Sequence, residues 1–142
     1  IYFILITDKL IKINKIIFIM KRSPKIVFHL CNLILIIFYI YPGSISGWII
    51  YDDFSHQPQI TRDFVISSNH LYVFIFLSTI GLWTYVNDKH FNFVIKYLFL
   101  LSIVLELFHI FIPERNFQFS DLFGNILGVI IPFAVYKIWK KI

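Results

Sequence analysis

The segment LELFHIFIPERNFQFSDLFGNILG concentrates the side chains that could do chemistry in this chain. Glu106 lies inside an apolar run, and His109 follows three residues later, which places both on one face of a helix. Arg115 comes next, and then Asp121 and Asn125, four residues apart. A carboxylate within a membrane-spanning helix costs about 3 kcal/mol, so Glu106 requires a cation, a proton or a water-filled cavity. Arg115 is the nearest cation in the sequence, and we expect it to pair with Glu106.

Binding of an anionic group is the first chemistry that these residues suggest. Arg115 would donate two hydrogen bonds to a phosphate or carboxylate, because its guanidinium matches the geometry of both. Glu106 would orient Arg115, while Asp121 and Asn125 would position polar groups of the ligand. These four residues are therefore the predicted ligand-binding site.

Catalysis is the second chemistry that the sequence leaves open. The substrate would be an envelope lipid or glycolipid. His70 or His109 would act as acid or base, Glu106 would be its partner, and Arg115 would stabilise the developing charge. No nucleophile elbow, zinc signature or phosphatase motif accompanies these candidates, so the catalytic residue, if there is one, is unknown.

A metal site is a weak alternative in the sequence. Asp52, Asp53 and His56 lie together in the segment DDFSHQPQ, but a solvated loop explains them equally well. The single cysteine, Cys31, excludes a cysteine metal cluster and an intrachain disulfide. We expect no metal and no cofactor.

A purely structural role is the third hypothesis. Asp121 could cap a helix, Asn125 could hydrogen-bond to a neighbouring helix, and Arg115 could extend to the lipid headgroups. Gly124 and Gly128 form a G-x-x-x-G step, which usually marks close packing of two membrane helices.

Composition places these residues in an all-α integral membrane bundle. Of the 142 residues, 58% are hydrophobic and 15% are charged, and the mean hydropathy is +0.78. Soluble domains average about 45–50% apolar and about 25% charged residues. Four apolar segments approach the length of about 20 residues that a span requires: 26–41, 69–86, 94–112 and 121–139.

Basic residues predict the orientation of these four helices. They precede the first helix, lie between the second and third, and follow the fourth, at Lys21, Arg22, Lys25, Lys89, Lys96, Lys137, Lys140 and Lys141. The positive-inside rule then places both termini in the cytoplasm and the polar residues above at the outer face. The same distribution argues against a nucleic-acid-binding face.

The first nineteen residues form a separate segment in this interpretation. They lack a Met, and the only Met of the chain, Met20, opens the sequence MKRSPK. We expect residues 1–19 to be upstream sequence or a short basic N-terminal segment, and residues 20–142 to be the membrane domain.

The core ELFHIFIPERNFQFSDLFGNILG resembles the signature of the VanZ-like family of small bacterial membrane proteins. The segments YIYPGS and NHLYVFIFL resemble two weaker elements of that family. The core residues that match in type and spacing are Glu106, Pro113, Arg115, Asp121, Asn125 and Gly128. The chain departs from the family pattern at His109 (Gln in the family), Glu114 (Gly) and Pro132 (Gly), and at Ile66 and Ser67 (Asp-Lys).

The resemblance implies a setting, the bacterial cell envelope, rather than a reaction. The family is associated with teicoplanin resistance. The implied location is the plasma membrane, and the implied partners are membrane lipids or a cell-envelope precursor. The sequence leaves the oligomeric state open.

Overall fold

The computed structural model describes residues 23–63 and 65–142, and the prediction about residues 1–19 lies outside these ranges. The described residues form helices and no strands. The first helix is Ser23–Ile40, called the N-terminal helix below. The others are α2 (Ile45–Tyr51), α3 (Ser68–Tyr85), α4 (Phe91–Phe108) and α5 (Phe119–Trp139).

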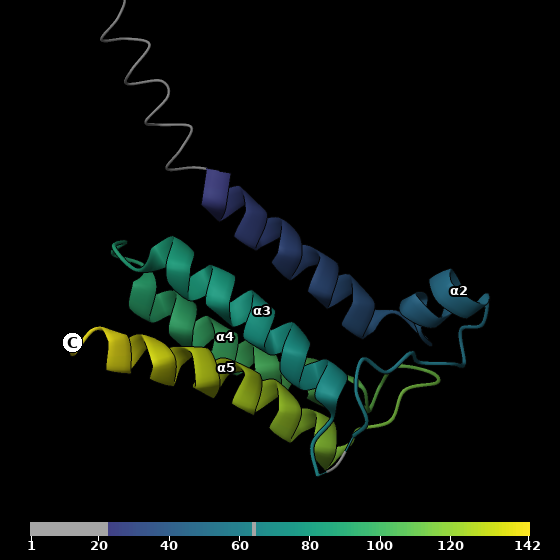
Figure 1. Cartoon of the computed structure of the whole chain (residues 1–142). Coiled ribbons are helices and arrows are strands. Elements are labelled where there is room, and N and C mark those ends of the chain that lie inside the picture. The colour runs from purple at the N-terminus through teal and green to yellow at the C-terminus, as the bar shows by residue number, and fades with distance from the viewer. Residues whose placement is uncertain (1–22, 64) are drawn as a thin grey trace, which may run out of the picture.

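The four long helices form an up-and-down bundle (Figure 1). The short helix α2 and the segments 52–63, 65–67 and 109–118 gather at one end of the bundle, called the loop end below. The C-terminus and the α3–α4 turn lie at the opposite end. The end of α4 therefore lies beside the beginnings of α3 and α5, which brings distant parts of the sequence together.

Three of the described helices are long and apolar enough to cross a membrane: the N-terminal helix, α4 and α5. This finding agrees with an all-α, multi-pass membrane protein. Helix α3 is as long as α4, at 18 residues each, but it is not one of the three. Its first turn contains Ser68, Asn69 and His70, and these polar residues lower its mean hydropathy.

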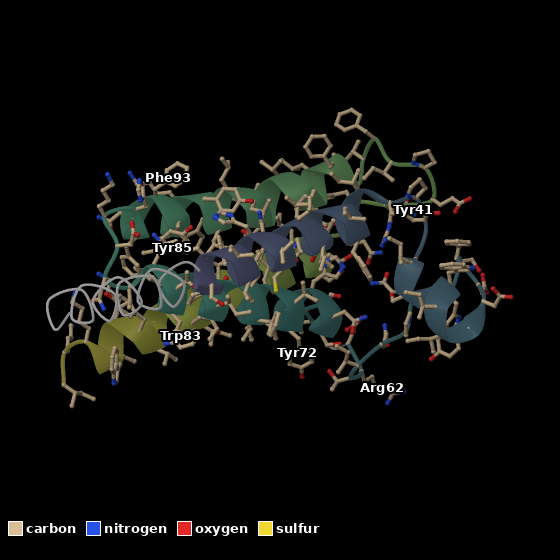
Figure 2. The ribbon with its side chains drawn as sticks, turned by 90° about the horizontal axis from the view of Figure 1, so that it is seen from above. Tyr41, Arg62, Tyr72, Trp83, Tyr85 and Phe93 are labelled. Atoms are coloured by element: carbon tan, nitrogen blue, oxygen red, sulfur yellow. The ribbon has the colours of Figure 1, made fainter. Side chains whose placement is uncertain are left out.

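The bundle surface is apolar over most of its length. Among the exposed side chains are Leu30, Leu33, Phe76 and Leu100. Aromatic side chains lie near both ends, with Trp83 and Phe93 at one end and Tyr41 and Tyr72 toward the loop end (Figure 2). An apolar surface with aromatic residues near each end is typical of a protein surrounded by lipid.

Two glycines of α5 allow it to pack closely on α3. A Cβ atom at Gly128 would lie 2.5 Å from Phe74 Cβ and 2.8 Å from Leu71 O. A Cβ atom at Gly124 would lie 2.8 Å from Ser67 O. The structure thus places both glycines of the G-x-x-x-G step at a helix contact, where no larger residue fits without a shift.

Candidate functional site

A buried polar cluster lies near the loop end of the bundle. Each of the four long helices contributes one of its members: Tyr39, His70, Glu106 and Asn125. All four are nearly inaccessible, at 8%, 6%, 0% and 0% exposure. Burial of this many polar groups is costly unless each finds a partner, so the contacts of each decide what the cluster can do.

The two carboxylate oxygens of Glu106 have different surroundings. Glu106 Oε1 accepts a hydrogen bond from the Gln118 backbone N–H at 3.1 Å and lies 3.3 Å from His109 Nδ1. Glu106 Oε2 is buried without a hydrogen-bond partner. It lies 3.7 Å from His70 Nδ1, which is too far for a hydrogen bond. Oε1 therefore has a hydrogen-bond partner, and Oε2 has none among the described residues.

The His70 ring lies between α4 and α5. Its Nδ1 atom lies 3.0 Å from the Tyr39 hydroxyl and 3.2 Å from Asn125 Oδ1. The Tyr39 hydroxyl itself donates to Asn125 Oδ1 at 2.7 Å. Because Asn125 Oδ1 can only accept, a proton on His70 Nδ1 suits this arrangement. The Nε2 atom then carries a lone pair, and it faces Asp121 Oδ2 at 3.5 Å.

The polar groups of Asn125 bind to three other elements of the bundle. Its Oδ1 atom contacts the N-terminal helix and α3 through Tyr39 and His70, as described above. Its Nδ2 atom donates to the Ser102 carbonyl oxygen on α4 at 3.3 Å. This residue therefore fits the predicted role in hydrogen bonding between helices as well as a role in orienting His70.

His109 closes the cluster at the end of α4. Its ring stacks on the Tyr39 ring, with centroids 5.6 Å apart and planes 17° apart. Its Nε2 atom lies 3.2 Å from the Tyr39 carbonyl oxygen, and its Nδ1 atom faces Glu106. Both ring nitrogens thus face oxygen acceptors, and since a neutral imidazole has one N–H, its hydrogen bond goes either to the Tyr39 carbonyl or to Glu106.

Arg115 does not form the expected ion pair with Glu106. Its Nη2 and Nε atoms donate to the carbonyl oxygens of Phe38 and Tyr41 at 3.2 and 3.5 Å. Phe38 lies in the last turn of the N-terminal helix and Tyr41 directly follows its end, where backbone acceptors lack helical partners. The prediction failed because loop 109–118 carries the guanidinium across this helix end instead of over α4. Burial lowers the pKa of Arg115, and the charge of Glu106 acts in the opposite direction.

A pocket of about 880 Å³ opens beside the cluster, between the N-terminal helix and α3. Its walls along these helices are apolar and include Ile34, Phe38, Val73 and Phe76. Polar side chains gather at its loop end, among them Gln57, Asn69, His70, His109 and Arg115. The pocket therefore combines an apolar slot with a polar end that holds a permanent cation.

The predicted site residues occupy different positions around this pocket. Arg115, His70 and His109 line it, whereas Glu106, Asp121 and Asn125 lie behind the lining and contact the pocket through His70 or His109.

Tyr39 is a member of the cluster that the sequence did not predict. Its hydroxyl and carbonyl contact three cluster members, but an aromatic residue at the end of an apolar segment is common at a membrane boundary. The only available signal was its position three residues before Pro42, at the same end of the bundle as His70.

The acidic loop 52–59 is not part of the cluster. Asp53 Oδ1 accepts hydrogen bonds from the Ser55 N–H and hydroxyl at 2.8 and 2.7 Å. These bonds lower the pKa of Asp53, which stays exposed to solvent. The loop therefore satisfies its own polar groups, as expected for a solvated turn.

Comparison of the chain with protein-family models, curated proteins and solved structures finds no match.

Proposed function

We propose that this chain is a VanZ-like protein of the bacterial plasma membrane that binds an anionic envelope lipid, or a related glycopeptide precursor, in the pocket beside the N-terminal helix. The observation that carries the proposal is the pocket's shape, an apolar slot ending at Arg115, His70 and His109. An acyl chain would lie between Ile34 and Phe76, and the anionic headgroup would reach Arg115.

Arg115 supports the choice of an anionic headgroup. Its Nε and Nη2 atoms are fixed on backbone carbonyls, which holds the guanidinium at the pocket wall. Its remaining N–H groups can bind an anion without first ordering the side chain, which lowers the entropic cost of binding. Charge-assisted hydrogen bonds of this kind contribute about 1.5–3 kcal/mol.

Two backbone turns support the VanZ-like interpretation. Glu114 has a φ of 62°, a conformation in which glycine is strongly favoured, and the family has Gly at this place. Gly43, after Pro42, has a φ of 75°. A Cβ atom at Gly43 would lie 3.3 Å from Glu114 Oε2, so the two turns are neighbours at the loop end.

We propose α3 as the fourth transmembrane helix. It runs beside α5 between the same two ends of the bundle (Figure 1). Its polar side chains His70 and Ser78 are buried inside the bundle, while Val73, Phe76 and Trp83 are exposed to the surroundings. With four spans and basic residues near Lys25 and Lys137–Lys141, both termini would be cytoplasmic and the loop end would face outward.

Lipid binding to the purified protein tests this proposal. Phosphatidylglycerol and phosphatidylcholine with matched acyl chains are compared by native mass spectrometry, for the wild type, Arg115→Gln and Arg62→Gln. We expect the wild type to bind the anionic lipid at least about tenfold more tightly, because phosphatidylcholine would lack one charge-assisted hydrogen bond to Arg115. Arg115→Gln should lose this preference, and Arg62→Gln, with its exposed side chain in another loop, should keep it. Equal binding of both lipids by the wild type would refute the proposal.

Catalysis remains a second candidate because of one observation, the position of His70 between two carboxylates. A histidine so placed can act as a general acid or base. Turnover of the bound lipid that disappears in His70→Gln while binding persists would favour an enzyme. If the wild type shows no turnover and His70→Gln loses lipid binding, the chain is a binding protein.

A further inference from the structure

We infer that His70, Glu106 and Asp121 form a binding site for a divalent first-row metal ion, such as Zn²⁺ or Mn²⁺. Each residue offers one ligand atom, and these atoms lie within 4.8 Å of one another. This inference does not depend on the proposed lipid ligand. It revises the expectation of no metal, which was based on the exposed loop 52–59.

One pair of the donor atoms already has the spacing of an occupied site. Donor atoms around a tetrahedral ion, at about 2.1 Å each, lie about 3.4 Å apart. His70 Nε2 and Asp121 Oδ2 are already 3.5 Å apart. Glu106 Oε2 lies nearest to the other ring nitrogen of His70, Nδ1, at 3.7 Å, so its side chain would have to turn toward Nε2 to complete the set. The three ligands come from α3, α4 and α5, so a bound ion would link these three helices.

The unsatisfied oxygen of Glu106 points to a ligand at this place. Glu106 is fully buried, and its Oε2 atom lacks a hydrogen-bond partner. A buried carboxylate oxygen without a partner is costly, and an ion would remove that cost. Asp121 adds a second negative charge, with a side chain only 15% exposed. Arg115 does not offset these charges through direct contact, because its bonds go to backbone carbonyls.

The surroundings of His70 fit those of a metal ligand. A histidine that binds a metal through one ring nitrogen usually donates its other N–H to an oxygen atom, which fixes the tautomer. His70 Nδ1 lies 3.2 Å from Asn125 Oδ1, an acceptor held by the Tyr39 hydroxyl. The Nε2 lone pair is thereby directed toward Asp121. Asn125 and Tyr39 are positioning residues in this arrangement.

The donor set decides the class of ion. One imidazole and two carboxylates suit Zn²⁺ or Mn²⁺, and no thiolate is present to favour Cu⁺. Three protein ligands leave a coordination position for water or an anionic oxygen, as in metal sites that bind substrates. His70 also lines the pocket, so this position is near the pocket's polar end.

Metal titration of the purified, chelator-treated protein tests the inference. Zn²⁺ and Mn²⁺ are titrated by calorimetry into the wild type, Glu106→Gln, Asp121→Asn and Glu114→Gln. We expect about one equivalent in the wild type and in Glu114→Gln, which changes an exposed acid in the loop between α4 and α5. Loss of a ligand should weaken binding at least about tenfold, since loss of a supporting residue alone costs 10–100-fold.

Two measurements on the wild type avoid dependence on variants that fail to fold. The metal should raise the melting temperature, because an ion that binds only the folded state stabilises it. Co²⁺ should give visible absorption bands without a thiolate charge-transfer band. Absence of binding in the wild type would overturn the inference. The inference would also be overturned if Glu106→Gln and Asp121→Asn each bound the metal as tightly as the wild type does, because the ion would then lie elsewhere.

Discussion

Replacement of Gly128 by Ala should loosen the contact that sets the distance between α3 and α5. The added Cβ atom would lie 2.5 Å from Phe74 Cβ, about 1 Å short of an ordinary carbon–carbon contact. It would also lie 2.8 Å from the backbone oxygen Leu71 O, which cannot move independently of α3. Overpacking of this kind costs about 1–3 kcal/mol. The gain from replacing a helical glycine is about 1 kcal/mol, so the net destabilisation should be at most about 2 kcal/mol.

A matched glycine on α3 provides the control. A Cβ atom at Gly81 would lie 2.8 Å from Phe28 Cε2, the far part of a side chain that can shift. Gly81→Ala should therefore cost less than Gly128→Ala, although both remove a buried helical glycine. Thermal melting in detergent measures the difference, at about 4 °C per kcal/mol. Equal destabilisation by Gly81→Ala and Gly128→Ala would show that the α3–α5 contact is no more rigid than the contact of Gly81 with Phe28.

Two further predictions concern an ion pair at the opposite end of the bundle and the orientation of the helices in the membrane. Lys25, which forms an ion pair with Asp88, holds the pKa of that carboxyl below its usual range. The ionised form of Asp88 thus stabilises the fold above about pH 4, and this stabilisation is lost as the pH falls through the lowered folded-state pKa. A pH series of melting temperatures should therefore show that Asp88→Asn is less stable than the wild type at pH 7 and that the difference disappears in acid. Reporter fusions after Lys141 and within loop 52–59 should place the first in the cytoplasm and the second outside, and a C-terminus outside the cell would contradict the four-span orientation.

Helix positions were predictable because apolar length and breakers are local properties of the sequence. The segments 26–41 and 121–139 correspond to Ser23–Ile40 and Phe119–Trp139. The third segment ends at Phe108 rather than at residue 112, because the chain turns before Pro113. Local periodicity also predicted that Glu106 and His109 share a helix face, and they contact each other.

The partners of the polar residues were not predictable in the same way. Arg115 is close to Glu106 in sequence, but the path of a loop decides which acceptor a long side chain reaches. Tyr39 lies 31 residues before His70 and 86 before Asn125, so its hydrogen bonds depend on how distant helices pack. Gly124 and Gly128 let α5 approach α3 closely, and this approach decides which side chains of the two helices meet. The sequence alone does not show which residues of α3 lie opposite these glycines.

The distribution of satisfied and unsatisfied atoms distinguishes a structural role from a ligand site within one cluster. Asn125 has partners for both polar atoms of its side chain, and both ring nitrogens of His109 face oxygens. These contacts already join the helices, so structural stabilisation accounts for both residues. It does not account for Glu106 Oε2, which is buried without a hydrogen-bond partner in the described part of the chain. Burial of two carboxylates beside one imidazole is costly without a compensating charge, and a bound cation would supply that charge.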